Sequence, residues 1–291
     1  MGNEYRRAQP RKGVKSMPRF SVHLDYLFTE RPLLQRIDAA AAAGFKAIEG
    51  RFPEGVPAAD YKSAVERNKL SVLGINTPTG GAGEFGFAAK PGHEKDWDKS
   101  FKEALDYVTT VGASAVHCLA GKVDPGQRAA AEKVYVENLK RAADLAAAKN
   151  IKLYLEPINP RDQPDYFLYQ VEHAADIIAK IGKPNVWMQY DFYHVQIVGG
   201  DLMRRMEKYF SIIGHIQCSQ VPVRGEPAEK GEINYPFVFA EVDRLGYKEW
   251  IGCEYRPRGR TVDGIRQDSQ PVIIVFEGMV QRQRLHRTLA M

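Results

Sequence analysis

The sequence predicts an α/β fold, a single (β/α)8 TIM barrel. The first observation is that short apolar runs of strand type alternate with amphipathic helical segments along residues 20–254. The second is that four later runs end in a carboxylate or amide, about one βα unit apart in a barrel of roughly 250 residues. The third is the turn His23-Leu24-Asp25-Tyr26 after the first run, which lacks the glycines of a doubly wound nucleotide-binding sheet.

Each expected strand is a short run rich in Val, Ile, Leu or aromatic residues, bounded by Gly, Pro, Asn or Asp. Continuous apolar runs of this kind are typical of parallel strands that are buried on both faces. We expect strands at residues 20–24, 46–49, 70–75, 114–119, 151–156, 186–191, 211–218 and 249–254.

Each expected helix has apolar residues on one stripe and usually ends at a glycine, as Gly44 ends the first helix. In the helix at 129–149 that stripe comprises Leu139, Ala142, Ala143 and Leu145. We expect helices at residues 29–43, 58–68, 94–111, 129–149, 168–181, 201–209 and 235–245. The segment 77–91 is rich in glycine, and its composition suits a mobile loop over a site at the barrel mouth.

The chain is expected to form one domain, because no linker interrupts the alternation. Residues 1–16 are basic and lack a hydrophobic period, which predicts a disordered extension before a barrel domain at 17–264. The tail at 265–291 changes in character, and only a helix at 277–289 suggests itself.

The charge of the chain is concentrated outside the expected barrel. The net charge is +5, of which residues 1–16 carry +4 and residues 265–291 carry +2, leaving −1 on the remainder. A nucleic-acid-binding domain carries its basic footprint on the folded part, so we expect no nucleic-acid partner.

The remaining composition indicates an ordinary intracellular protein. The three cysteines, Cys118, Cys218 and Cys253, lie in expected strands without metal-ligand spacing and suit buried thiols in a reducing cytosol. We see no secretory signal and no apolar run of the ~20 residues that a membrane helix needs. We therefore expect a cytoplasmic protein without membrane association, and leave open whether it is a homo-oligomer.

Four oxygen-bearing side chains mark the expected mouth of the barrel. Glu156, Asp191, Gln217 and Glu254 end successive apolar runs, and alternation along each strand places Tyr154, Gln189, His215 and Gly252 on the same inward faces. Three carboxylates at one mouth would repel one another unless a cation neutralised them. Ligands that are all oxygen favour a hard divalent ion, Mg²⁺ or Mn²⁺, over zinc.

Two further side chains are candidates for binding a substrate. His194 follows Asp191 by three residues and could reach a ligand held at the ion, and Arg224 lies in a loop after Gln217 and could bind an anion. His23 and His117 are interpreted as packing residues. The sequence has no Gly-x-Ser-x-Gly elbow and no P-loop, so neither a serine hydrolase nor a nucleotide phosphotransferase has local support.

Eleven short blocks between residue 17 and about residue 264 carry a resemblance to the hydroxypyruvate isomerase family of the xylose-isomerase-like (AP-endonuclease-2) barrels. They include Gly44-Phe45-Lys46-Ala47-Ile48-Glu49, Glu156-Pro157-Ile158-Asn159, Tyr190-Asp191-Phe192-Tyr193-His194, Gly214-His215-Ile216-Gln217, Arg224-Gly225-Glu226-Pro227 and Gly252-Cys253-Glu254-Tyr255-Arg256-Pro257. The resemblance implies that the four strand-end residues are metal ligands, that Glu156 and Glu254 are also the acid/base pair, and that His194 and Arg224 contact substrate. His23 and His117 depart from it, because many relatives have asparagine at both places.

The function that this resemblance implies is a metal-dependent isomerase, of the aldose–ketose type, which interconverts hydroxypyruvate and 2-hydroxy-3-oxopropanoate by proton transfer through an enediolate. A 2-oxo-tetronate isomerase or a ketose 3-epimerase on the same site is the alternative. An AP-endonuclease-type phosphodiesterase fits less well, because such sites hold several metal ions with many histidines. A catalytically silent sugar-binding barrel is disfavoured by the intact pair of glutamates.

Overall fold

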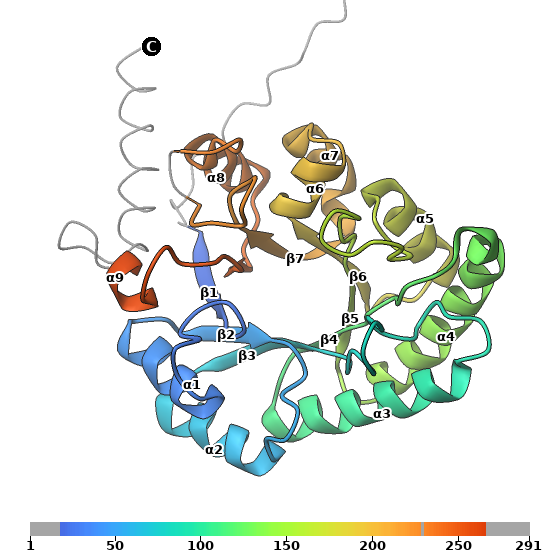
Figure 1. Ribbon diagram of the computed structural model, residues 1–291, viewed down its shortest axis with the longest axis horizontal. Coiled ribbons are helices and arrows are strands. Elements are labelled where there is room, and N and C mark those ends of the chain that lie inside the picture. Colours follow the sequence, from blue (N-terminus) through green and yellow to red (C-terminus); the bar gives the residue numbers. More distant parts are fainter. Residues whose placement is uncertain (1–17, 228–229, 266–291) are drawn as a thin grey trace, which may run out of the picture.

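Eight parallel strands form a closed barrel in sequence order, with the helices around the outside (Figure 1). The computed structural model describes residues 18–227 and 230–265. The barrel closes where β1 pairs with β8, from Arg19 opposite Trp250 to Val22 opposite Cys253. The expected barrel is confirmed, whereas the expectations for residues 1–16 and for a helix at 277–289 lie outside the described residues.

The strands are short and mostly buried, as the apolar runs predicted. Their bounds are β1 Arg19–His23, β2 Ala47–Gly50, β3 Ser71–Asn76, β4 Ala115–His117, β5 Lys152–Leu155, β6 Val186–Asp191, β7 Ile213–Cys218 and β8 Trp250–Cys253. Every neighbouring pair is parallel, so the carboxyl ends of all the strands meet at one mouth.

The helices follow their strands and cover the barrel. Their bounds are α1 Leu33–Ala42, α2 Ala58–Asn68, α3 Glu94–Val111, α4 Arg128–Ala147, α5 Val171–Ile181, α6 Phe192–Val198, α7 Leu202–Tyr209, α8 Tyr235–Leu245 and α9 Thr261–Ile265, with 3-10 turns at η1 Pro125–Gln127 and η2 Phe210–Ile212. Helices α2, α3 and α8 and strand β6 have the predicted bounds.

Several details of the helices differ from expectation: α1 begins at Leu33 rather than residue 29, and α9 was not predicted. Helix α5 begins at Val171 rather than residue 168, because the chain before it stays extended: the N–H of Phe167 donates to the carbonyl of Gly121. Helix α6 was not predicted; it begins directly after Asp191, whose Oδ1 accepts the N–H of Tyr193 at 2.9 Å. Leu145 was expected on the buried stripe of α4 but is 57% exposed.

The interior of the barrel is polar near its mouth, as the alternation along the strands predicted. The ring of Tyr154 stacks on that of His215 at a centroid distance of 5.7 Å and an interplanar angle of 16°. Gly214 makes room for this pair, since a Cβ there would lie 2.9 Å from Cε1 of Tyr154. Leu153 and Leu155 alternate with Tyr154 and belong to the apolar core.

The glycine-rich segment 77–91 packs onto the barrel mouth. Gly86 forms a bridge with Ala120 and has φ +98°, and a Cβ there would lie 2.3 Å from the carbonyl oxygen of Leu119, so only glycine fits. Lys90 and Glu84 form an ion pair at the base of the segment. The segment thereby brings Phe85 to the wall of the pocket at the mouth.

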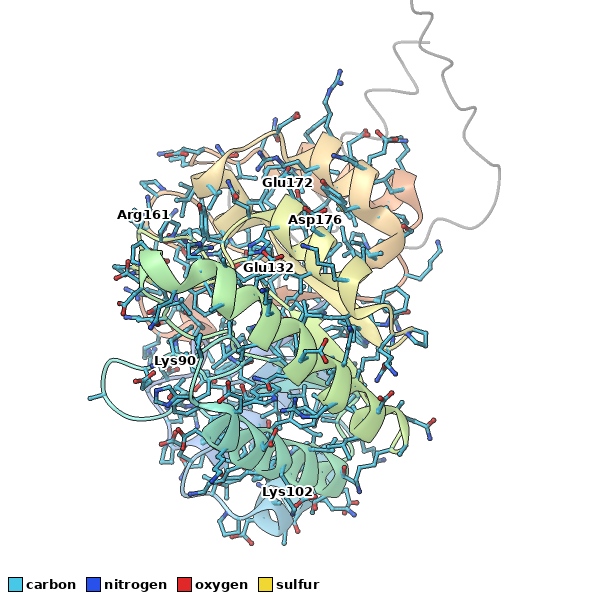
Figure 2. The ribbon with its side chains drawn as sticks, turned by 90° about the vertical axis from the view of Figure 1, so that its right-hand side faces the viewer. Lys90, Lys102, Glu132, Arg161, Glu172 and Asp176 are labelled. Carbon is cyan, nitrogen blue, oxygen red and sulfur yellow. The ribbon has the colours of Figure 1, made fainter. Side chains whose placement is uncertain are left out.

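The outer surface is charged and links neighbouring helices. Glu132 on α4 accepts hydrogen bonds from Lys180 at 2.5 Å and pairs with His173 at 3.3 Å, both on α5. Figure 2 shows this face, with Glu172 and Asp176 of α5 nearby. In the described part of the chain, no helix combines the length and apolar character that a bilayer crossing requires. The three cysteines are buried and free, as expected.

Candidate active site

The four strand-end residues lie at the mouth of the barrel, as predicted. Asp191 ends β6, Gln217 lies in β7, and Glu156 and Glu254 directly follow β5 and β8. Strand register places Asp191 opposite Gln217, which in turn lies opposite Gly252. All four side chains are buried.

Glu156 and Asp191 form a cluster with His194. One ligand atom from each residue lies within 4.8 Å of the others, so this group could hold a metal ion. Nε2 of His194 lies 3.6 Å from Oε1 of Glu156 and 3.6 Å from Oδ2 of Asp191. His194 reaches this position because α6 begins immediately after the Asp191 cap.

Arg224 occupies the centre of the acidic cluster rather than an exposed loop. Its side chain is buried, and Nη2 donates to Oδ2 of Asp191 at 3.0 Å and forms an ion pair with Oε1 of Glu254 at 2.9 Å. The guanidinium lies against the rings of Tyr26 and Tyr193, 4.9 and 4.6 Å from their centroids. Part of the neutralising charge that three carboxylates require is therefore supplied by the chain itself.

His194 receives more donors than a neutral ring can satisfy. Its Nδ1 faces the N–H of Asn159 at 3.1 Å, and its Nε2 lies 3.0 Å from Nη1 of Arg224. Burial and the charge of Arg224 hold the pKa of His194 well below its usual range, so the ring is neutral. A neutral imidazole has one lone pair. The donor that faces the protonated ring nitrogen is therefore left without an acceptor on His194.

Gln217 and Glu254 lie beside the Glu156 cluster and have other partners. Oε1 of Gln217 accepts from Nε2 of Gln189 at 2.8 Å, and the same nitrogen donates to Oε2 of Glu156 at 3.0 Å. Oε1 of Glu254 lies 3.7 Å from Nε2 of His23. Gln217 thus shares one donor with Glu156, and Glu254 shares Arg224 with Asp191.

The donor set fits a hard cation. Oε1 of Glu156 and Oε2 of Glu254 are buried and have no hydrogen-bond partner among the described residues. Burial raises the pKa of Glu156 well above its usual range, and the charges of Glu254 and Asp191 raise it further. Burial raises the pKa of Asp191 to about 7, although Arg224 opposes the shift. A divalent ion would satisfy the orphaned oxygens and offset this repulsion.

The pocket above these residues is small. It has a volume of about 50 Å³, and its lining includes Glu156, His194, Glu254, Tyr26, Arg51, Phe85, His117 and Arg224. A second hollow of about 260 Å³ adjoins it and shares Arg51. Such a site suits a small polar molecule whose outer end lies beside Arg51.

Several residues of the site were not predicted. His117 lies 3.6 Å from Oε2 of Glu156, and burial, with His23 and His215, lowers its pKa to about 3, so it is a neutral wall of the pocket rather than a packing residue. Glu49 lies beneath the cluster, and its position at the end of an apolar strand was the same signal that pointed to Glu156. Nothing in the sequence pattern singled out Tyr26 or Arg51.

Known proteins share this architecture and much of the sequence. A family model described as "Xylose isomerase-like TIM barrel" matches residues 37–271. The 2-oxo-tetronate isomerase of Cupriavidus necator is 42% identical over 252 residues, which cover 86% of this chain and 96% of that protein. The hydroxypyruvate isomerase of Escherichia coli is 37% identical over 255 residues, covering 86% and 98%.

Solved structures agree with this placement. The structure of "AP endonuclease, family 2" from Brucella melitensis superimposes with a TM-score of 0.84 at 37% identity, covering 86% of this chain and 98% of that one. The 3-keto-D-glucoside 4-epimerase from E. coli has a TM-score of 0.72 at 17% identity, covering 87% and 98%, and at that identity shows the fold alone. By sequence and by fold, the chain belongs to the xylose isomerase-like TIM barrel family.

Proposed function

We propose that the protein is a metal-dependent isomerase of small hydroxy-oxo acids that interconverts hydroxypyruvate and 2-hydroxy-3-oxopropanoate. The observation that carries the proposal is the buried cluster of Glu156, Asp191 and Glu254, with two orphaned carboxylate oxygens, beneath a pocket of about 50 Å³. Relatives named hydroxypyruvate isomerase and 2-oxo-tetronate isomerase cover most of the chain and support it.

Glu156, Asp191, Gln217 and Glu254 would hold one Mg²⁺ or Mn²⁺ ion. When bound, that ion supplies positive charge where two neighbouring substrate oxygens become negative. His194 lies beside this set and provides an N–H for a substrate oxygen. The substrate is small enough for the pocket, and its carboxylate points outward to Arg51.

The two glutamates would move the proton between adjacent carbons. Glu254 is held by its ion pair with Arg224, and both glutamates line the pocket, each with an oxygen that has no hydrogen-bond partner among the described residues. One of the two takes the proton from one carbon and the other returns a proton to the neighbouring carbon, while the hydroxyl proton passes from one substrate oxygen to the other. Acid–base help of this kind contributes about 10²–10⁴-fold for each participant.

The first experiment is turnover of purified hydroxypyruvate and of 2-oxo-tetronate by the protein with Mn²⁺ or Mg²⁺. We expect turnover of hydroxypyruvate, a loss of about 10²-fold or more in Glu254→Gln, and normal folding of that variant by circular dichroism. The matched control is Glu249→Gln, an exposed acid at the other end of β8. Failure to turn over either acid would defeat the proposal.

The second candidate is isomerisation of 2-oxo-tetronate. The 42% identity to an enzyme of that name favours it. The ratio of kcat/KM for the two acids decides between them. Phosphodiesterase activity has less support because the pocket is small and buried, and cleavage of abasic DNA by the purified protein would revive it.

A further inference from the structure

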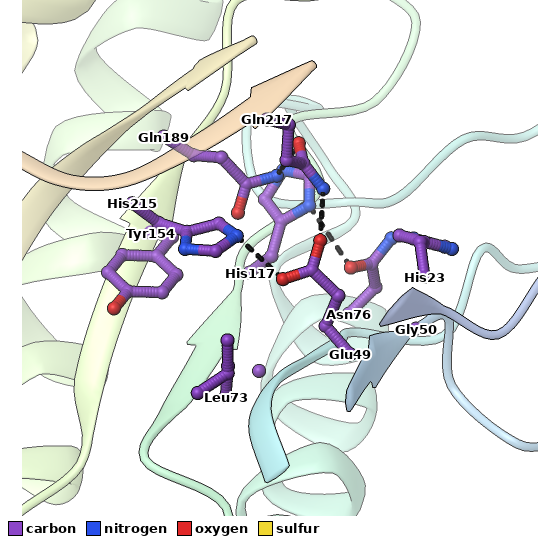
Figure 3. A pocket seen from close by; sticks show the side chains of 11 residues that line it. His23, Glu49, Gly50, Leu73, Asn76, His117, Tyr154, Gln189, His215 and Gln217 are labelled. Carbon is purple, nitrogen blue, oxygen red and sulfur yellow. Dashed lines mark hydrogen bonds and ion pairs between the residues drawn. The ribbon is translucent and has the colours of Figure 1, made fainter. Parts of the chain in front are cut away.

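A polar layer lies beneath the acidic cluster, inside the barrel (Figure 3). Its centre is Glu49 at the end of β2, which is 4% exposed. Oε2 of Glu49 lies 2.6 Å from Nε2 of His215 and accepts from the hydroxyl of Ser21 at 3.4 Å.

Glu49 begins a chain of hydrogen bonds that ends at Glu156. Oε1 of Glu49 accepts from Nε2 of Gln217 at 2.9 Å. Oε1 of Gln217 then accepts from Nε2 of Gln189, which also donates to Oε2 of Glu156. Figure 3 shows the amide of Gln217 between Glu49 and Gln189.

The direction of this chain is set by Glu49. Because Oε1 of Glu49 accepts from Nε2 of Gln217, the amide turns its NH₂ group toward Glu49 and its oxygen away from it, toward Nε2 of Gln189. An amide without such a partner can rotate by 180° at little cost, because its oxygen and nitrogen ends have the same shape. Only the oxygen end of a glutamine can bind a cation.

The barrel is shaped to hold Glu49 in this place. A Cβ on Gly252 would lie 2.1 Å from Oε1 of Glu49 and 2.9 Å from Cγ of Gln217, so the carboxylate fills space that only glycine leaves free. On its other side, His215 is fixed by stacking on Tyr154. Gly252 and His215, which hold Glu49 in place, are separate from the ion pair between Asp191 and Arg224.

We propose that Glu49 is a positioning residue that keeps the amide oxygen of Gln217 turned toward the cation side of Glu156. This inference rests on the proposed metal dependence but names a residue that the proposed function does not use. Glu49 acts through geometry, by accepting one hydrogen bond, rather than by attracting the cation with its charge. Partners that orient a metal ligand typically contribute about 10–100-fold to metal affinity.

Two conservative variants separate geometry from charge. Glu49→Gln keeps the reach to Gln217 and an accepting oxygen but removes the charge, while the ring of His215 can accept instead of donate. Glu49→Asp keeps the charge but is one methylene shorter and cannot reach Nε2 of Gln217 from the same backbone. Ser21→Ala, which removes the third partner of Glu49, is the control.

The measurement is the affinity of the metal-free protein for Mn²⁺ by isothermal titration calorimetry, with urea unfolding of each variant alongside. We expect Glu49→Asp to bind Mn²⁺ at least about 10-fold more weakly, and Glu49→Gln and Ser21→Ala to stay within about threefold of the unchanged protein. Equal affinities for all, or a Glu49→Gln defect as large as that of Glu49→Asp, would overturn the proposal. A protein that binds Mn²⁺ but does not isomerise would refute the proposed function and leave this inference standing.

Discussion

Gly252 offers the sharpest test of how the interior of the barrel is packed. Replacing it with alanine adds one methyl group, and the backbone there does not need glycine, since its φ lies outside the left-handed region. The added Cβ would meet Oε1 of Glu49 at 2.1 Å, so this oxygen must move by about 1 Å to reach an ordinary contact. That shift separates Glu49 from Nε2 of Gln217 and strains its contact with His215.

The expected cost follows from these losses. Overpacking a core costs about 1–3 kcal/mol, and taking a partner from a buried charge costs about 3–5 kcal/mol. The entropic gain of Gly→Ala, about 0.4–1 kcal/mol, offsets little of this. We therefore expect Gly252→Ala to lower the free energy of unfolding by about 3 kcal/mol or more, which moves the urea midpoint by about 1 M at an m-value of about 3 kcal/mol/M.

Two further variants make this measurement decisive. Gly126→Ala is the control, because nothing lies within 4 Å of a Cβ there, and it should change stability by less than about 0.5 kcal/mol. In a Glu49→Ala background the main clash is absent, so Gly252→Ala should cost much less than in the natural sequence. If Gly252→Ala unfolds at the same urea concentration as the unchanged protein, the packing described for Glu49 is wrong.

Four other changes have expected outcomes. Arg224→Met leaves Asp191 and Glu254 without their shared donor and should destabilise the metal-free protein by about 3–5 kcal/mol in urea; unchanged stability would contradict the buried ion pairs. Arg51→Ala should raise KM for hydroxypyruvate about 10-fold or more while kcat stays within twofold, and a defect in kcat alone would argue against a binding role. Because His117 has a pKa of about 3 when folded and 6.5 when unfolded, it lowers the free energy of unfolding of the metal-free protein as pH falls below 6.5. The free energy of unfolding of His117→Asn should therefore rise relative to that of the unchanged protein by about 1.4 kcal/mol for each pH unit between pH 6 and 4. Parallel curves of unfolding free energy against pH for the two proteins would refute this. Chelation should abolish turnover and lower Tm, and Mn²⁺ should restore both, whereas full activity after dialysis against chelator would exclude metal dependence.

The barrel and the strand-end residues were predictable because both depend on short-range patterns. Apolar runs alternating with helices predict βα units, and a carboxylate that ends such a run must face the mouth, as Glu156 and Asp191 do. The bounds of α3 and β6 follow from the same patterns, because Gly112 ends α3 and Asp191, which ends β6, caps the helix that follows. A one-turn difference at α5 arises because Phe167 bonds in an extended conformation to a loop far away in sequence.

The internal organisation of the site was not predictable from these patterns. Arg224 lies in a loop whose path is fixed by its partners, so its burial between Asp191 and Glu254 depends on three separate segments. Glu49 also lies near the end of an apolar strand, but its side chain lies beneath the cluster because Gly252, which has no Cβ, leaves room for its carboxylate. His117 reads as a packing residue until its distance to Glu156 is known. These are tertiary relations, and spacing along one chain does not contain them.

Anomalous scattering from crystals soaked in Mn²⁺ would locate the cation and its ligands. We expect one peak within bonding distance, about 2.0–2.6 Å, of oxygens from Glu156, Asp191, Gln217 and Glu254. The orphaned Oε1 of Glu156 should be among those oxygens. A peak elsewhere, or none while Arg224 still bridges Asp191 and Glu254 at saturating Mn²⁺, would contradict this expectation.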